Sequence, residues 1–179
     1  MGQYYLIVNC SKGEFIHPHK MGDGMKILEF GSSGKGTMMG LAILLANGNG
    51  RGGGDLDSEN PVIGSWAGDR IVVAGDYGDG GKFLGKVSKT KLKKIAKECF
   101  TEGHQKPENV NLFNYADAEF EDISEKVLAA LMDDDYFREE FEKAAKDREW
   151  DSTFKQAVTA AKALREQSQK QSLCAGITK

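Results

Sequence analysis

Glycine is unevenly distributed along this chain of 179 residues, and its distribution constrains the fold more than any single motif does. Residues 1–85 hold 20 of the 22 glycines but only 16 of the 51 charged side chains. Glycine favours tight turns and weakens long helices, so this half is expected to form short strands joined by turns. The charged, glycine-poor remainder favours helices.

The first half contains runs of β-branched and aromatic residues that are typical of short strands. They predict two hairpins, one from residues 4–9 and 14–19 and the other from residues 62–66 and 70–77. Pro18 has no amide hydrogen, which indicates that the second strand lies at an edge or ends there. Residues 37–46 predict one buried helix with Thr37 as its N-cap, while residues 26–31 fit a strand or a short helix.

The second half shows the spacing of three and four residues that is typical of amphipathic helices. Three stretches fit this pattern: residues 88–103 with Ser88 or Thr90 as N-cap, residues 124–134 with Ser124 as N-cap, and residues 135–171. The last stretch forms either one helix or two in tandem, and acidic residues 133–135 suit a helix start. Its apolar stripe is Trp150, Phe154, Ala157, Val158, Ala161 and Leu164.

These patterns together predict an α+β fold. We expect a small antiparallel sheet of hairpins with one buried helix, followed by a helical C-terminal half. Residues 1–130 are expected to form a single α+β domain, and residues 131–179 a C-terminal helical extension.

The composition narrows the classes of function. The net charge of −3 and the pI near 5.7 give no overall basic surface, so a nucleic-acid partner is not expected. The longest apolar stretch, residues 38–46, is too short to span a bilayer, and the first residues lack the pattern of a secretion signal. The three cysteines form no paired motif that would suggest disulfides or a thiolate zinc site. We therefore expect a cytoplasmic protein that makes no membrane contact.

The segment FGSSGKGT at residues 30–37 is similar in composition to a phosphate-binding loop. Its spacing differs, because that motif requires Gly where Glu29 stands and Ser or Thr where Gly36 follows Lys35. The glycines therefore indicate a tight turn into a helix. An anion bound at the N-terminus of that helix remains a weaker alternative.

Two histidines separated by one residue suggest a metal site. If His17 and His19 lie in one strand, their imidazoles project from the same face and could bind a divalent metal together with Asp23. Further ligands would come from Asp55, Asp57, Asp69, Asp76 or His104. The alternative is that both histidines pack or form hydrogen bonds at the surface.

Two segments rich in glycine and aspartate suggest a ligand site. A long loop at residues 47–61 contains RGGGDLD, and polar side chains bracket an apolar strand within residues 66–81. Such loops position groups that contact ligands. Arg70 could act as an anion clamp, with a carboxylate as base or metal ligand. The alternative is a solvated loop and Gly-Asp pairs that only form turns. The candidate ligand-binding residues are Arg51, Asp55, Trp66, Asp69, Arg70 and Asp76.

Four strings occur in order along the first 130 residues: MGQYYLIVN, HPHKMGDGMKILEFG, RGGGDLDSENPVIGSWAGDRIVVAGDY and NLFNYADAEFEDIS. In these strings the chain resembles a family of small microbial proteins that open with MGQYY or MGQYW and contain a domain of unknown function. The resemblance covers about residues 1–130 and leaves the C-terminal helices outside it. Because this family has no established activity, the resemblance implies no catalytic residue.

Two functions fit these observations. The first is the binding of a small polar or anionic ligand, or of a divalent metal ion, in the Gly/Asp/His-rich first half. The second is a non-enzymatic interaction module, in which the C-terminal helices contact a protein partner or a second copy of the chain. The sequence links no nucleophile to a base and an orienting group, so no reaction is predicted.

Overall fold

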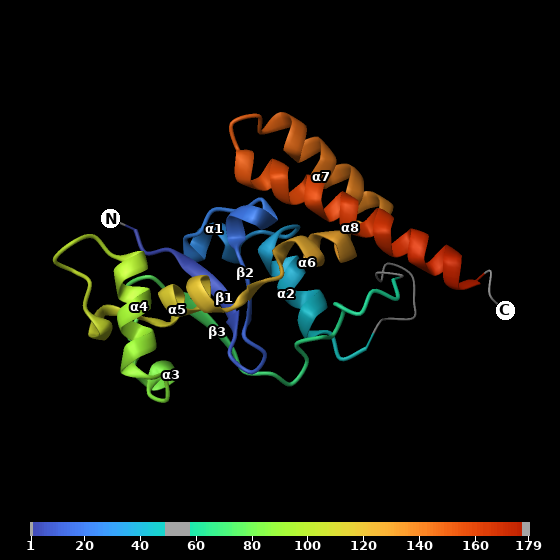
Figure 1. Ribbon diagram of the computed structural model, residues 1–179. Coiled ribbons are helices and arrows are strands. Elements are labelled where there is room, and N and C mark those ends of the chain that lie inside the picture. Colours follow the sequence, from blue (N-terminus) through green and yellow to red (C-terminus); the bar gives the residue numbers. More distant parts are fainter. Residues whose placement is uncertain (1, 49–57, 177–179) are drawn as a thin grey trace.

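The computed structural model describes residues 2–48 and 58–176, with side chains as far as residue 171. Within these residues the sheet has four strands: β1 Tyr5–Asn9, β2 Glu14–Ile16, β3 Ile71–Gly75 and β4 Glu121–Asp122. Their order is β3-β1-β2-β4, and helices pack against both faces of the sheet (Figure 1). The predicted α+β class with a helical C-terminal half is confirmed.

The described α-helices are α1 Ile27–Gly31, α2 Thr37–Leu45, α3 Gly81–Leu84, α4 Lys89–Cys99, α5 Leu112–Glu119, α6 Ser124–Leu131, α7 Asp135–Asp147 and α8 Ser152–Gly176. Two short 3-10 helices, η1 Pro18–Met21 and η2 Pro107–Asn109, complete the helical elements of the described residues. Residues 26–31 thus adopt the helical alternative, and the last predicted stretch is two helices, α7 and α8. The sequence patterns did not predict α3, α5 or β4.

β1 and β2 form the predicted hairpin, with Ile7 opposite Ile16. β2 ends before Pro18, which begins η1, in agreement with the missing amide hydrogen of proline. β4 pairs with the other side of β2 in parallel orientation. The sheet is therefore mixed, whereas the sequence predicted only antiparallel hairpins.

The second predicted hairpin is wrong. β3 pairs with β1, and residues 62–66 form successive turns instead of a strand. The backbone amide of Gly64 donates to the carbonyl of Ile43, and that of Trp66 donates to the carbonyl of Leu44. These bonds tie the segment to the end of α2, so it is not available to pair with β3.

Two predicted N-caps are also wrong. Thr37 and Ser124 are the first helical residues of α2 and α6, and the capping position lies one residue earlier in each case. Aspartates accept the amide hydrogens of these first residues. The amide of Thr37 donates to Asp23 at 2.6 Å, and that of Ser124 donates to Asp122 at 2.9 Å.

β1 is buried on both faces, which explains its uninterrupted apolar sequence. Ile7 faces a large hydrophobic core that includes residues of α2, α6 and α8. Leu6 and Val8 face a smaller core on the side of α5. A third cluster, which includes Leu84 and Ile95, lies between α3, α4 and η2.

The C-terminal helices share the large core with the first 130 residues. α8 packs against α6 and η1, and its side chains Phe154, Ala157 and Ala161 are almost completely buried there. Figure 1 shows α7 and α8 side by side across one side of the molecule. A continuous core therefore crosses the boundary predicted at residue 130. None of the helices within the described ranges is long and apolar enough to cross a membrane.

Candidate functional site

A cleft of about 570 Å³ opens between residues 19–29 and the turn that joins α7 to α8. The first wall contains η1, the glycine-rich turn after it and the start of α1. The second wall is residues 148–153, which are more than 100 positions away in the sequence. The cleft is lined by His19, Gly22, Asp23, Gly24, Glu29, Arg148, Trp150, Asp151, Ser152 and Thr153.

Two glycines allow the first wall to fold tightly. Gly22 has a backbone φ of 83°, which residues with a side chain rarely adopt. A Cβ at this position would also lie 3.0 Å from the ring of Phe154. A Cβ on Gly24 would lie only 2.1 Å from the carboxylate of Glu29. The absence of both side chains lets the second wall pack close to the first and brings Glu29 to the cleft.

Backbone amides hold the three carboxylates of the cleft in place. Asp23 accepts the amide hydrogen of Thr37, and Asp151 accepts that of Phe154 at 3.1 Å. Glu29 accepts the amide hydrogen of Lys26 at 3.1 Å and lies 3.5 Å from its ammonium group. These bonds restrict the side chains without burying them, because all three still line the cleft.

Arg148 connects the two walls. Its guanidinium group donates to the carbonyl oxygen of Gly22 and lies 5.6 Å from the ring centroid of Phe154. Trp150 follows it in the turn, and its side chain is 81% exposed. The sequence placed Trp150 on the apolar stripe of the last helix, but the chain leaves the helical path at residue 148 and directs the indole to the cleft and solvent.

The cleft contains two of the three predicted metal-binding residues, His19 and Asp23. His17 and His19 have ring centroids 5.6 Å apart, but β2 ends at Ile16, so the two histidines do not share one strand face. Within residues 2–48 and 58–176, no group of three or more His, Cys, Asp or Glu side chains is placed to hold a metal ion. The structure therefore does not assemble the predicted trio into a metal centre.

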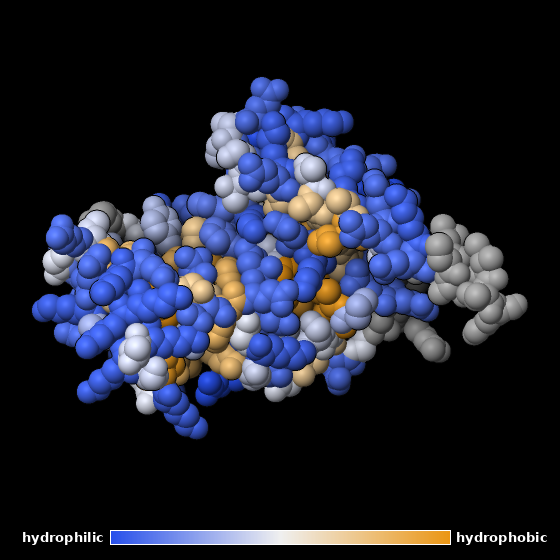
Figure 2. All heavy atoms as spheres, in the orientation of Figure 1, coloured by the Kyte–Doolittle hydropathy of each residue, from blue (hydrophilic) through white to orange (hydrophobic). Residues whose placement is uncertain are grey.

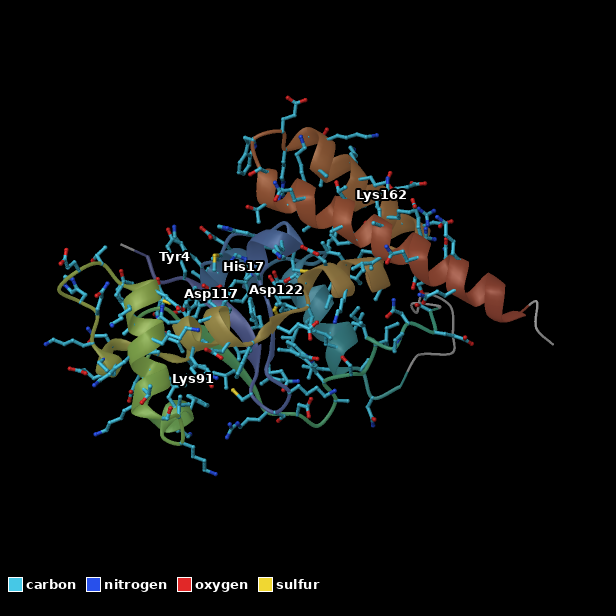
Figure 3. The ribbon with its side chains drawn as sticks, in the orientation of Figure 1. Tyr4, His17, Lys91, Asp117, Asp122 and Lys162 are labelled. Atoms are coloured by element: carbon cyan, nitrogen blue, oxygen red, sulfur yellow. The ribbon has the colours of Figure 1, made fainter. Side chains whose placement is uncertain are left out.

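His17 lies in a different, partly buried environment. Its backbone amide donates to Ser124 Oγ at 2.8 Å, and its Nδ1 atom has no hydrogen-bond partner among the described residues. Burial lowers the pKa of His17, and the negative charges of Asp122 and Asp117, both labelled in Figure 3, oppose this shift. The imidazole therefore favours its neutral form.

Four of the six predicted ligand-binding residues lie in the described part of the chain, and none lines the cleft. Arg51 and Asp55 lie outside the described residues, as does Asp57. Trp66 is fully buried, and its indole nitrogen donates to Glu14 at 2.6 Å. It is a core residue with a satisfied polar group, so its side chain does not face solvent.

The other three side chains are also kept apart. Asp69 accepts a hydrogen bond of 2.8 Å from the side chain of Asn9, and Asp76 accepts one of 3.0 Å from the amide of Tyr4. Arg70 is exposed beside Phe83, with its guanidinium 5.7 Å from the ring centroid. Both aspartates thus support the ends of β3, as turn-forming aspartates do.

The helix N-terminus that suggested an anion site is already occupied by the chain itself. The Asp23 carboxylate accepts the first amide hydrogen of α2, and a Cβ on Gly36 would lie 2.3 Å from this carboxylate. The amide of Gly36 donates to Ser33, and Lys35 pairs with Glu140 at 2.6 Å. A bound phosphate would have to displace an internal anion.

The sequence patterns missed four of the charged or aromatic residues in the cleft: Glu29, Arg148, Trp150 and Asp151. The string DST at residues 151–153 is a helix-start signal that could have located the break between α7 and α8. Nothing in the local sequence indicates that this turn faces residues 19–29.

Comparisons with protein-family models, with curated proteins and with solved structures find no match for the chain. The resemblance to the MGQYY family accordingly stays a prediction.

Proposed function

We propose that the protein binds a small polar molecule with a positively charged amine in the cleft between residues 19–29 and 148–153. One observation carries this proposal. Three carboxylates and an exposed indole line the same cleft, and Arg148 is the only lysine or arginine among the described residues that line it.

The charge of the lining favours a cation. Asp23, Glu29 and Asp151 contribute three negative charges. Arg148 contributes one positive charge, and the Lys26 ammonium group, 3.5 Å from Glu29, contributes a second, so these groups leave a net charge of −1 at the cleft. The guanidinium group of Arg148 is directed to Gly22 and Phe154. The carboxylates therefore dominate the field in the cleft, and a diffusing amine is attracted to it.

The indole of Trp150 supplies the second half of the recognition. An aromatic face within about 6 Å of an ammonium group attracts it by roughly 0.5–2 kcal/mol, with the larger values in desolvated sites. The backbone bonds to Asp23, Glu29 and Asp151 already restrict these side chains. Binding then costs less conformational entropy than it would with freely rotating groups.

The test is calorimetric titration with spermidine, accompanied by tryptophan fluorescence. The chain contains two tryptophans, of which Trp66 is buried and Trp150 is 81% exposed, so a response that disappears in Trp150→Phe reports the cleft. We expect saturable binding at a single site. Glu29→Gln should weaken it about 1.4- to fivefold, because one exposed charge pair contributes roughly 0.2–1 kcal/mol.

Glu149→Gln is the matched control, because Glu149 is exposed on the same turn but does not line this cleft. Equal weakening by Glu149→Gln and Glu29→Gln would mean that spermidine senses only the overall charge, which contradicts the proposal. Saturable binding of Zn²⁺ without any response to spermidine would also contradict it and would favour the metal hypothesis.

The interaction hypothesis receives less support from the geometry. It required an available apolar stripe on the C-terminal helices, but Phe154, Ala157, Val158 and Ala161 pack in the large core. Of the six residues of this stripe, only its two end residues are exposed: Trp150 at 81% and Leu164 at 37%.

A further inference from the structure

A strongly basic surface lies at the end of the molecule formed by α3 and α4, away from the cleft. Residues 82–97, which we name the basic segment, contain seven lysines and no acidic residue. The formal charge of this segment is +7, whereas the net charge of the whole chain is −3. All other residues together therefore carry a net charge of −10. Figure 2 shows hydrophilic residues over most of this end, and Lys91 is labelled there in Figure 3.

The fold directs these lysines outward. Ile95 and Ala96 of α4 are fully buried in the third hydrophobic cluster with Leu84 and Val110. Lys89, Lys93 and Lys97 follow one another at intervals of four and therefore share a helix face. All three are exposed, which places a row of ammonium groups on the side of α4 away from its core.

Most of these charges are not neutralised within the described part of the chain. Lys91 pairs with Glu119 at 2.6 Å, and Lys94 lies 3.8 Å from Glu98. The remaining lysines of the segment are exposed or at the surface and have no ion-pair partner among the described residues. They are Lys82, Lys86, Lys89, Lys93 and Lys97.

This arrangement is unfavourable for the isolated protein. Like charges four residues apart destabilise a helix by roughly 0.2–0.5 kcal/mol per pair, and α4 contains two such pairs in its exposed row. A helix that needed only solubility would intersperse glutamates with the lysines. The repulsion is relieved by a ligand that presents several negative charges in a row.

We propose that the basic segment binds the phosphate backbone of nucleic acid without sequence preference. The exposed row from Lys89 to Lys97 extends about 12 Å, at 1.5 Å per helical residue. Each strand of a DNA duplex presents one phosphate per roughly 3.4 Å of axis, so the row and the adjacent Lys82 and Lys86 match about four phosphates. Lysines act as point charges and do not read base edges bidentately as arginine does.

The same surface is poorly suited to a lipid membrane. A helix that lies in a membrane interface buries an exposed apolar face among the lipids. In α4 the apolar side chains Ile95 and Ala96 are already packed in the protein, and no large hydrophobic side chain within residues 80–110 is substantially exposed. The observations therefore favour a polyanion that is contacted only through its charges.

The net charge of the chain led to the prediction of no nucleic-acid partner. The net charge is the sum of a basic segment, at +7, and the other residues of the chain, at −10. The negative remainder is repelled by phosphates, so binding would orient the molecule with α3 and α4 toward the nucleic acid.

The test is fluorescence anisotropy of the full chain with a labelled 20-base-pair DNA duplex at 50 to 200 mM KCl. With about four phosphate contacts, we expect affinity to fall roughly 10²-fold over this range, since counterion release gives a slope near −0.9 per contact. Lys93→Ala combined with Lys97→Ala should reduce the slope by about two and weaken binding roughly tenfold at 50 mM. Alanine is a better helix former than lysine, so circular dichroism should show α4 retained.

The control variant combines Lys143→Ala with Lys155→Ala, which removes the same charge from exposed positions of α7 and α8. It should bind the duplex nearly as well as the unmodified chain. Absence of duplex binding at 50 mM KCl, or equal weakening by both double variants, would overturn the proposal. Binding to phosphatidylserine vesicles but not to the duplex would also overturn it.

Discussion

At the scale of single residues, Asp23 connects the fold to the candidate site. Its carboxylate accepts the first amide hydrogen of α2 at 2.6 Å and also lines the cleft. An acidic group at a helix N-terminus is stabilised by the helix dipole. The same interaction fixes the position of one of the three negative charges that we expect to attract an amine. Asp23 therefore contributes to the stability of α2 and to the electrostatics of the cleft.

His17 gives the fold a predictable pH dependence. Burial lowers its pKa below the unfolded value of about 6.5, so the unfolded state binds the proton more tightly. Stability from this residue is complete above the unfolded pKa and is lost as the pH falls below it. We expect His17→Gln to reduce the loss of unfolding free energy between pH 7.5 and pH 5.5, as measured by urea denaturation at each pH.

Exposed His104 provides the comparison for this measurement. His104→Gln should leave the pH dependence unchanged. The groups that act on His17 include His19 and Lys20, which lower its pKa, and Asp117 and Asp122, which raise it. A His17→Gln variant with the same loss of stability as the unmodified chain would show that Asp117 and Asp122 fully offset the effect of burial.

Residue-level predictions from the sequence succeeded where the interaction is local. Asp134 accepts the amide hydrogens of Tyr136 and Phe137 at the start of α7, and Ser88 accepts that of Lys91. The caps expected at Thr37 and Ser124 failed. For Thr37 the reason is that Asp23, 14 positions earlier, accepts its amide hydrogen. Spacing rules contain no information about such a contact.

At the scale of elements, the packing of α2 depends on a residue without a side chain. A Cβ on Gly40 would lie 2.8 Å from Met21 of η1 and 2.9 Å from Val127 of α6. Gly40→Ala should therefore lower the unfolding free energy by about 1 kcal/mol, because overpacking costs roughly 1–3 kcal/mol and exceeds the gain in helix propensity. Denaturant unfolding monitored by circular dichroism measures this change.

Gly31→Ala is the matched substitution. Gly31 is the last residue of α1, and a Cβ there would have no heavy atom within 4 Å. This variant should be stabilised by about 0.4–1 kcal/mol, since alanine restricts the unfolded chain more than glycine does. If both variants were stabilised, the close packing of α2 against η1 and α6 would be refuted.

Helices and strands with a strong periodicity of apolar residues were predictable from the sequence, whereas the elements against which they pair or pack were not. The β1–β2 hairpin and helices α2, α4, α6 and α8 follow local patterns of apolar residues. The pairing of β3 with β1 and the addition of the two-residue β4 to β2 depend on contacts between distant segments. The cleft is unpredictable for the same reason, because its two walls are brought together by the packing of α8 against η1 and by the hydrogen bond from Arg148 to the carbonyl of Gly22.

At the scale of the whole molecule, the two proposed sites occupy different parts with opposite charge. The cleft beside the α7–α8 turn has three carboxylates and one guanidinium group in its lining, and the basic segment lies around α3 and α4. Figure 1 shows α3 and α4 on the other side of the sheet from α7 and α8. Substitutions in one site should therefore leave binding at the other unchanged, as expected for distant sites that share no contacts.

The large core also decides whether the first 130 residues can fold alone. α8 contributes Phe154, Ala157, Val158 and Ala161 to it, and loss of Phe154 alone through Phe154→Ala should cost about 3–5 kcal/mol. Since a domain of this size is stable by only about 5–15 kcal/mol, a chain ending at residue 134 should lose cooperative thermal unfolding and bind a dye specific for exposed apolar surface. Gln156→Ala, at an exposed position of α8, should change neither property. If the shortened chain unfolded cooperatively at a temperature near that of the full chain, the predicted independent domain ending near residue 130 would be supported instead.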